Sequence, residues 1–261
     1  MDKITFADCC HDLSSRSPAA RKTLAAWQAR PGYGKVVNFV KNFTHEYLFS
    51  ITPDDVRDVM EASSHPLGDV KTAEQLRYIE NFTTPFAFQH LFHWYLEQNK
   101  SIPTWKQFRD WMVTGPGSAH WYIPLRRLLE RRYPNADRNT WSRAARWRLG
   151  KLYLSNMREL DLLARLRHAG IPIRYHVLAD VLFRVDFWAD NVLVCTYFPN
   201  KKYRAGAQGR KPLAEKFFSS AVPPFVIAHV PITRQGFGEF WLATDESLEQ
   251  LVETIRASIH G

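Results

Sequence analysis

Three carboxylates in the last third of the sequence could do chemistry, although Glu159 could instead pair with a helical neighbour such as Arg158 or Arg165. Glu159 lies in the helical run RELDLLARLRH, and Asp180 and Asp186 lie in a segment rich in Val, Leu and Phe. Burying a lone charge is costly, so an acid in such a segment must face water or a partner. The acids therefore indicate either a binding or catalytic site or a set of structural ion pairs, with Arg184 as the candidate partner of Asp186.

The pattern around these acids predicts the elements that position them. From about Asp137 the apolar residues recur with the period of one long helix, and Gly170 predicts the C-terminal end of that helix. After Gly170 the period changes to that of strands. We expect them at IPIRYHV, VLFRVDFW, NVLVCTYF, PFVIAHVPI and EFWLA, followed by a final helix over 245–258.

Two of these strands would meet in a hairpin. Alternation along a strand over 180–188 puts Asp180, Arg184 and Asp186 on one face. Asp190-Asn191 lies between this strand and the next and suits a two-residue turn, which would bring Asp180 opposite Lys201.

The order helix, strand, hairpin, helix near 212–218, strand resembles the restriction-endonuclease-like superfamily, whose signature is written PD-(D/E)XK. The resemblance covers roughly residues 155–258. It implies that Glu159 is the acid of the core helix and that Asp180 or Asp186 is the acid of the second strand. In that family such carboxylates bind Mg²⁺ or Mn²⁺, which orients the water that hydrolyses a DNA phosphodiester.

The third strand departs from the family pattern. Where the family has an acid-x-Lys motif, this chain has CTY at 195–197 or, later, NKK at 200–202. The resemblance gives Lys201 or Lys202 the place of the lysine near the scissile phosphate. Neither triplet supplies a carboxylate, although Glu215 on the following helix could supply a displaced one.

A net charge of +9 and a pI near 9.5 indicate a polyanionic partner, for which we expect DNA. The alternative is a solvated helix face or one that binds an acidic protein. Only Glu130 and Asp137 interrupt the densest basic stretch. Its expected nucleic-acid-binding residues are Arg126, Arg127, Arg131, Arg132, Arg143, Arg146, Arg148 and Lys151. Arg138 lies in the same basic stretch.

Aromatic and histidine residues offer two further candidates. Trp141 and Trp147 are interleaved with arginines but do not share a helix face well, so we expect one in the core and the other at a contact surface. His90, His93 and Glu97 share one helical stripe. Without another ligand nearby we expect them to pack in a helical core and not to bind zinc.

The sequence of residues 1–138 predicts helices, because residues whose side chains can cap a helix precede several amphipathic runs. The expected starts are Ser17-Pro18, Thr52-Pro53, Thr72 with Gln75, and Thr104 with Gln107. The predicted fold class is therefore α+β: an N-terminal all-helical domain (1–138) that binds DNA or a partner, then a small α/β restriction-endonuclease-like domain (139–261).

The sequence has no run of ~18 apolar residues and no secretory signal at its start, so we expect a cytoplasmic protein without a membrane partner. Two functions remain open. One is metal-dependent DNA hydrolysis in a mobile-element or phage-defence system, which the resemblance implies. The other is a catalytically inactive nuclease-fold subunit that binds nucleic acid or assembles a larger complex with other proteins.

Overall fold

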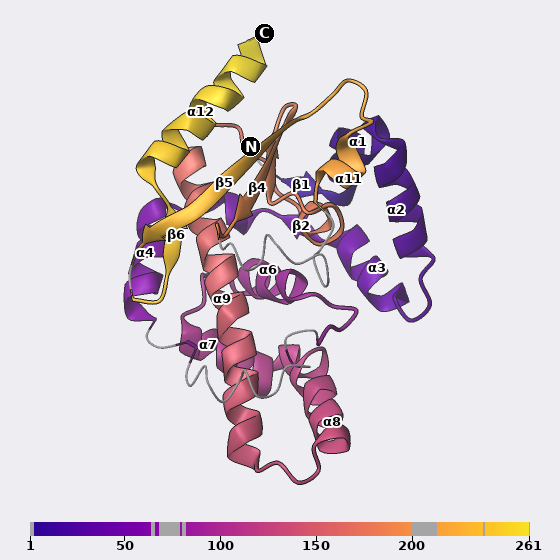
Figure 1. The fold of residues 1–261 in the computed structure, drawn as a ribbon, viewed down its shortest axis with the longest axis vertical. Coiled ribbons are helices and arrows are strands. Elements are labelled where there is room, and N and C mark those ends of the chain that lie inside the picture. The colour runs from indigo at the N-terminus through magenta and orange to yellow at the C-terminus, as the bar shows by residue number, and fades with distance from the viewer. Residues whose placement is uncertain are drawn as a thin grey trace. The chain divides into compact units, whose positions relative to one another are not determined.

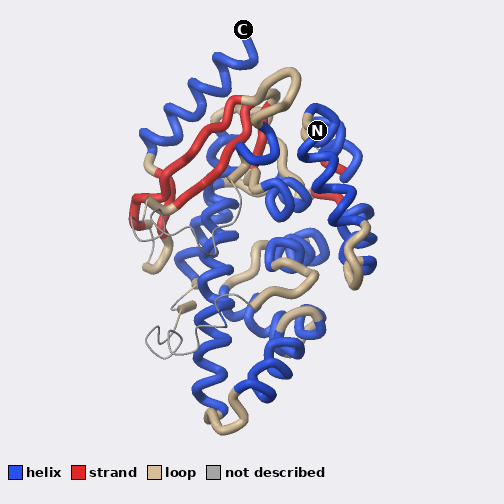
Figure 2. The backbone as a smooth tube through the Cα atoms, turned by 45° about the vertical axis from the view of Figure 1, so that its right-hand side comes forward, coloured by secondary structure: helices blue, strands red, loops and turns tan. Residues whose placement is uncertain are grey.

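The computed structural model describes residues 3–63, 66–67, 79, 82–199, 213–236 and 238–260, and it has the predicted α+β class (Figures 1 and 2). Its contacts divide the chain into two compact units. The sheet unit comprises Met1–Pro53, Glu159–Gly236 and Trp241–Gly261, and the helical unit comprises Asp54–Arg158 and Phe237–Phe240. The division predicted between residues 138 and 139 does not coincide with these units, because residues 1–53 pack with the C-terminal part of the chain.

A four-stranded sheet with the order β3-β4-β5-β6 forms the centre of the sheet unit (Figure 2). β3 pairs antiparallel with β4, β4 runs parallel to β5, and β5 pairs antiparallel with β6. The four strands are β3 (Phe187–Ala189), β4 (Val192–Tyr197), β5 (Val226–Gln235) and β6 (Trp241–Ala243). α12 (Asp245–His260) contacts β4 and β5, and the long helix α9 (Arg138–His168) ends in this unit.

The predicted hairpin turn is confirmed. Ala189 pairs with Val192 across Asp190-Asn191, and Asp190 has a left-handed φ of 49°, which the tight turn requires. The residue pairs keep the register that this turn sets as far as Phe187, where β3 begins. Lys201 lies outside the described residues.

The prediction of a strand over 181–188 is wrong for the first half of that segment. Ala179–Phe183 form a π-helical turn that ends at Arg184, whose φ is 63°. The Nδ1 atom of His176 accepts the backbone N–H of Leu178, the residue before this turn. A run such as VLADVLF, apolar except for Asp180, fits a buried strand or a buried helix equally well.

The strand predicted at IPIRYHV is reduced to a single antiparallel bridge between Arg174 and Trp188. Asp180 and Asp186 therefore do not alternate along one strand. Asp180 lies on the π-helical turn, and Asp186 directly precedes β3.

Residues 1–53 cover the sheet from its β3 side. Asp12 Oδ2 accepts the indole N–H of Trp188 at 2.8 Å and forms an ion pair with Arg174 at 2.6 Å. Ser17 Oγ donates to the carbonyl of Phe217. The elements of this segment are β1 (Ile4–Thr5), α1 (Phe6–Asp12), α2 (Pro18–Gln28), α3 (Gly34–Asn42) and β2 (Thr44–His45), and α2 contacts α11 (Glu215–Phe218).

Aromatic packing around Tyr153 forms the core of the helical unit. The Tyr153 ring lies 5.6 Å from that of Trp105 and 5.9 Å from that of Phe108. Its hydroxyl donates to the carbonyl of Pro103 at 2.9 Å and is bonded to Ser63 Oγ, also at 2.9 Å. The helices of this unit are α4 (Pro53–Ala62), α6 (Phe88–Asn99), α7 (Trp105–Val113), α8 (Tyr122–Arg132) and the first part of α9.

The predicted helix starts are confirmed where the structure describes them. Ser17 caps α2 by accepting the N–H of Ala20, and Thr104 and Gln107 form a reciprocal capping box at α7. α4 begins at Pro53, as expected. The start proposed at Thr72 and Gln75 lies outside the described residues.

We predict that Gly150→Ala lowers stability. An added Cβ at position 150 would lie 2.3 Å from the carbonyl oxygen of Pro66, so the helix and the segment facing it must separate. Such overpacking costs about 1–3 kcal/mol, against the gain of about 0.5–1 kcal/mol that Ala normally brings to a helix. The measurement is the free energy of unfolding by denaturant.

Gly34→Ala is the matched control. Gly34 is the first residue of α3, and an added Cβ there has no atom within 4 Å. The control should leave stability unchanged or slightly higher, and equal stability of the two variants would contradict the close approach at Gly150.

Candidate functional site

The three predicted acids come from three elements of the sheet unit. Glu159 is on the C-terminal part of α9 and Asp180 is on the π-helical turn, and these two residues are only 8% and 5% exposed. Asp186 precedes β3 and is partly exposed. Asp180 is hydrogen-bonded to Tyr175, and the charges of Glu159 and Asp186 also act on that side chain.

Tyr175 is the buried centre of this acid cluster, which we define as Glu159, Asp180 and Asp186 with Tyr175 and Arg184. The Tyr175 hydroxyl donates to Asp180 Oδ2 at 3.3 Å. Burial raises the pKa of Tyr175 well above its ordinary value, and the charges of Asp180, Glu159 and Asp186 raise it further. The phenol therefore stays protonated and serves as a hydrogen-bond donor.

Arg184 brings positive charge to the cluster. Burial lowers the pKa of Arg184, while Asp180 and Asp186 oppose that shift by favouring the charged guanidinium. An ion pair with Arg184 therefore stays the structural alternative for Asp186. The left-handed backbone at Arg184 places this side chain at the end of the π-helical turn.

Asp186 is also engaged with the neighbouring strand. Its Oδ2 atom accepts the backbone N–H of Thr196 at 2.5 Å and the Thr196 hydroxyl at 2.7 Å. Charge-assisted bonds of this kind are among the stronger ones in proteins. They fix Asp186 to β4.

The remaining groups near β4 are a buried thiol and an ion pair. Burial, followed by the charges of Asp186 and Glu215, raises the pKa of Cys195, so the thiol is a poor nucleophile. Glu215 Oε1 and His229 Nε2 are 2.6 Å apart. Burial opposes ionisation of Glu215, but hydrogen bonds from its own backbone and from His229, with the charge of His229, lower its pKa overall.

Oxygen atoms of the acid cluster are already engaged with protein partners. Mg²⁺ requires several oxygen atoms that converge on one point. Here Asp180 accepts from Tyr175, Asp186 Oδ2 accepts twice from Thr196, and Arg184 supplies the compensating charge. Within the described ranges, no three His, Cys, Asp or Glu side chains are grouped so as to hold a metal ion. Lys202, like Lys201, lies outside those ranges.

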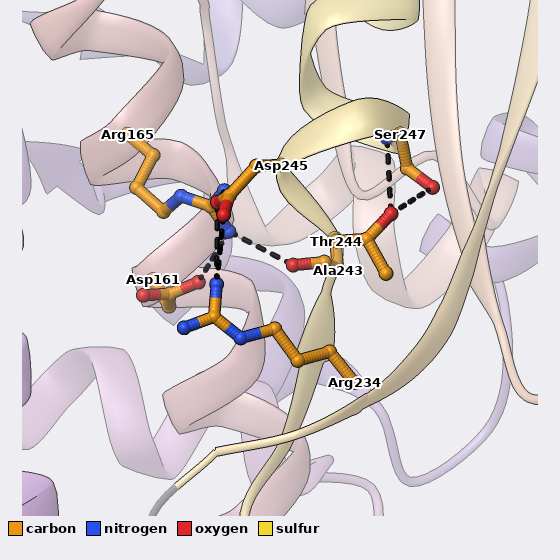
Figure 3. A network of polar contacts seen from close by, with 7 residues as sticks. All are labelled: Asp161, Arg165, Arg234, Ala243, Thr244, Asp245 and Ser247. Atoms are coloured by element: carbon orange, nitrogen blue, oxygen red, sulfur yellow. Dashed lines mark hydrogen bonds and ion pairs between the residues drawn. The ribbon is translucent and has the colours of Figure 1, made fainter.

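A second polar network on α9 is structural. In Figure 3, Arg165 from α9 and Arg234 from β5 converge on Asp245 at the start of α12, at 2.6 and 3.1 Å. Arg165 also donates to the carbonyl of Ala243 and pairs with Asp161. Burial raises the pKa of Asp161, and Arg165 opposes that shift. The network fastens the end of α9 to the sheet on which the acid cluster depends.

The predicted basic residues lie on two consecutive helices of the helical unit. α8 and the beginning of α9 lie side by side and are joined by a short loop (Figures 1 and 2). Arg146 and Arg148 are half-buried. The exposed members of this basic hairpin are Arg126, Arg127, Arg131, Arg132, Arg138, Arg143 and Lys151.

The two tryptophans of the basic hairpin divide as expected. Trp147 is 3% exposed and belongs to the core, with Lys151 Nζ 4.3 Å from its ring centroid. Trp141 is half-buried and lines a cleft between α8 and α9. His90 and His93 are buried in α6, as the packing interpretation predicted.

Comparisons with known proteins give no relative. No protein-family model matches the sequence, no curated protein matches it, and no solved structure matches the fold. Among the described helices, none is long and apolar enough to cross a membrane. What the protein does must therefore be inferred from its own side chains.

We predict a contribution of His90 to the pH dependence of stability. Burial lowers the pKa of His90 from 6.5 to about 3, so the folded state holds the neutral imidazole, which accepts the N–H of Ala87. Its contribution is complete above pH 6.5 and is lost as the pH falls toward 3, because only the unfolded chain binds the proton. His90→Gln should therefore flatten the decline in unfolding free energy between pH 6.5 and 4.

Denaturant titrations at a series of pH values measure this difference between wild type and variant. Exposed His168→Gln is the control and should keep the wild-type slope. Parallel curves for wild type and His90→Gln would show that His90 does not titrate with folding.

Proposed function

We propose that this protein binds nucleic acid through the basic hairpin of α8 and α9. The observation that supports this proposal is the clustering of exposed arginines on two adjacent helices, in a chain whose net charge is +9. Arginine on an exposed surface binds phosphate well, because its planar guanidinium donates two parallel hydrogen bonds and displaces condensed counterions.

The acids in the hairpin do little to neutralise this surface. Asp137 is engaged as a cap of α9, since its carboxylate accepts the N–H groups of Asn139 and Thr140 at 2.6 and 3.3 Å. Glu130 pairs with Arg126 at 3.3 Å, one helical turn away. The basic residues of the hairpin outnumber these two acids, so its surface retains a net positive charge that attracts phosphates.

The sheet unit supports the proposal of a restriction-endonuclease-like subunit. The chain passes from α9 through the bridge at Arg174, the hairpin β3-β4 and α11 to β5, which is the order that the resemblance implies. Asp180 accepts from Tyr175 and Asp186 accepts from Thr196, and the charge of Arg184 interacts favourably with both acids. This favours the binding subunit, which would act with protein partners in a mobile-element or phage-defence system, over hydrolysis by this chain.

DNA hydrolysis is the second candidate, and one observation favours it. Glu159, Asp180 and Asp186 all act on Tyr175, so three acids far apart in sequence lie near one another, as the nuclease resemblance implies. The family's metal would be Mg²⁺ or Mn²⁺, and Lys201 and Lys202 remain the proposed phosphate contacts.

The binding proposal predicts an effect of charge on the salt dependence of affinity. Changing Arg127, Arg131 and Arg143 to Ala should weaken binding to duplex DNA and reduce the slope of log Kd against log salt. The reduction is roughly 0.9 for each phosphate that the variant no longer neutralises, because fewer counterions are released. Fluorescence anisotropy over a series of salt concentrations measures both quantities.

The matched control removes equal charge from exposed lysines of the sheet unit. Lys22, Lys35 and Lys41 lie on α2 and α3, and their triple replacement by Ala should leave the slope nearly unchanged. If both triple variants lose affinity equally, net charge and not the basic hairpin explains the binding.

The hydrolysis candidate predicts metal-dependent nicking of plasmid DNA that depends on Asp186. Asp186→Asn retains the shape but removes the charge, so nicking should fall ~100-fold or more if several kcal/mol of charge stabilisation are lost. Asp190→Asn in the adjacent turn is the isosteric control and should remain active. Intact plasmid after incubation of wild type with Mg²⁺ or Mn²⁺ would leave the binding subunit as the function.

A further inference from the structure

A cleft of about 290 Å³ lies between α8 and α9 within the basic hairpin. Each helix supplies residues at helical spacing, so one face of each forms a wall. The α8 wall consists of Tyr122, Arg126, Leu129 and Glu130, and the α9 wall consists of Arg138, Trp141, Ser142 and Ala145.

The cleft has an aromatic, partly apolar interior. Leu129 and Ala145 are only 2% and 6% exposed, while Trp141 and Tyr122 are half-buried and so present part of their rings to the opening. A planar group entering between the helices would meet these rings, and base stacking on aromatic side chains is favourable for every base.

Trp141 also provides an unused donor. Its indole N–H is buried and has no hydrogen-bond partner among the described residues. A buried donor without a partner is destabilising, and a carbonyl oxygen or ring nitrogen of a ligand would satisfy it. The donor and the ring together favour a planar ligand that has acceptors on its edge.

Two arginines supply positive charge at the cleft. Arg126 is held by Glu130, and Arg138 is exposed and pairs with no acid in the described part of the chain. The amides at the start of α9 do not bind an anion here, because Asp137 already accepts those of Asn139 and Thr140. A phosphate would therefore be bound by the arginine side chains.

From these features we propose that the cleft binds a single nucleotide, with the base against Trp141 and Tyr122 and the phosphate at Arg126 and Arg138. This inference rests on the proposed nucleic-acid binding and deepens it, because it makes an unpaired nucleotide the preferred feature of the substrate. The volume lies at the lower limit of the ~300–1,000 Å³ typical of ligand pockets, which suits one nucleotide and excludes a longer strand.

The test compares three DNA probes of equal length in anisotropy titrations. One is a perfect duplex, one carries a single bulged adenosine, and one carries an abasic site in place of that bulge. The bulged duplex should bind roughly 5- to 100-fold more tightly than the other two, the range expected from stacking one base. Free dAMP, titrated by calorimetry, shows whether the nucleotide must belong to a strand.

Variants of cleft residues test whether a preference for the bulged duplex depends on the cleft. Trp141→Ala should abolish the preference for the bulge, and Trp141→Phe, which retains a ring but lacks the donor, should reduce it. Trp241→Ala is the control, because Trp241 is 41% exposed on β6 and lies outside the cleft. Arg138→Glu alters only an exposed side chain, so it tests the site even if Trp141→Ala does not fold.

The outcomes separate this inference from the proposed function. A bulge preference that Trp141→Ala or Arg138→Glu removes supports the cleft as the site of an unpaired nucleotide. Binding of dAMP that the same variants remove supports it as a site for a free nucleotide. Duplex binding with neither effect overturns the cleft inference alone, whereas no binding of any probe overturns both.

Discussion

The four-stranded sheet has to be covered on both of its faces, and the organisation of the sheet unit follows from this constraint. Phe187, Trp188 and Ala189 are consecutive residues of β3, so their side chains point to alternate faces, yet each is at most 1% exposed. The same holds for residues 192–194 of β4. A strand buried on both sides requires a layer on each. α9 and α12 contribute cover, and residues 1–53 provide the rest.

The N-terminal segment is held in place by polar contacts that apolar packing alone would not specify. Asp12 bonds to the Trp188 indole and pairs with Arg174, so the first helix is aligned with the start of the hairpin. Arg16 donates to the carbonyl of Pro223 at 2.9 Å and stacks on Phe225 at 3.8 Å. These contacts accompany the packing of α2 on α11.

Local chemistry made much of the fold predictable. A cap such as Ser17 or the Thr104 box acts within four residues, and the Asp190-Asn191 turn fixes its own register, so all were recognised correctly. The end of α9 was predicted for the same reason. The π-helical turn was missed because its largely apolar run suits a helix or a strand, and the bond from Leu178 to His176 that precedes it has no sequence signature.

The features of the units and of the site that the sequence does not reveal depend on distant partners. The bond between Trp188 and Asp12 joins residues 176 apart, and no periodicity records such a pair. Asp180 and Asp186 could be singled out because charge in an apolar context is rare, and Glu159 because the family resemblance implies an acid on that helix. Tyr175, on which all three act, stands between Arg174 and His176 in the sequence, and its role follows only from the assembled structure.

The discontinuous sheet unit has a consequence for biosynthesis. Its first segment ends at Pro53 and its second begins at Glu159, so nearly the whole helical unit is synthesised between them. Chains fold domain by domain as they emerge from the ribosome, and contacts between distant residues form slowly because loop closure costs entropy. The nascent N-terminal helices consequently remain without their sheet until the hairpin has been translated. During that interval Asp12 and Ser17 lack Trp188 and Phe217, their partners in the folded protein, so the N-terminal helices are not yet anchored and molecular chaperones have a substrate to protect.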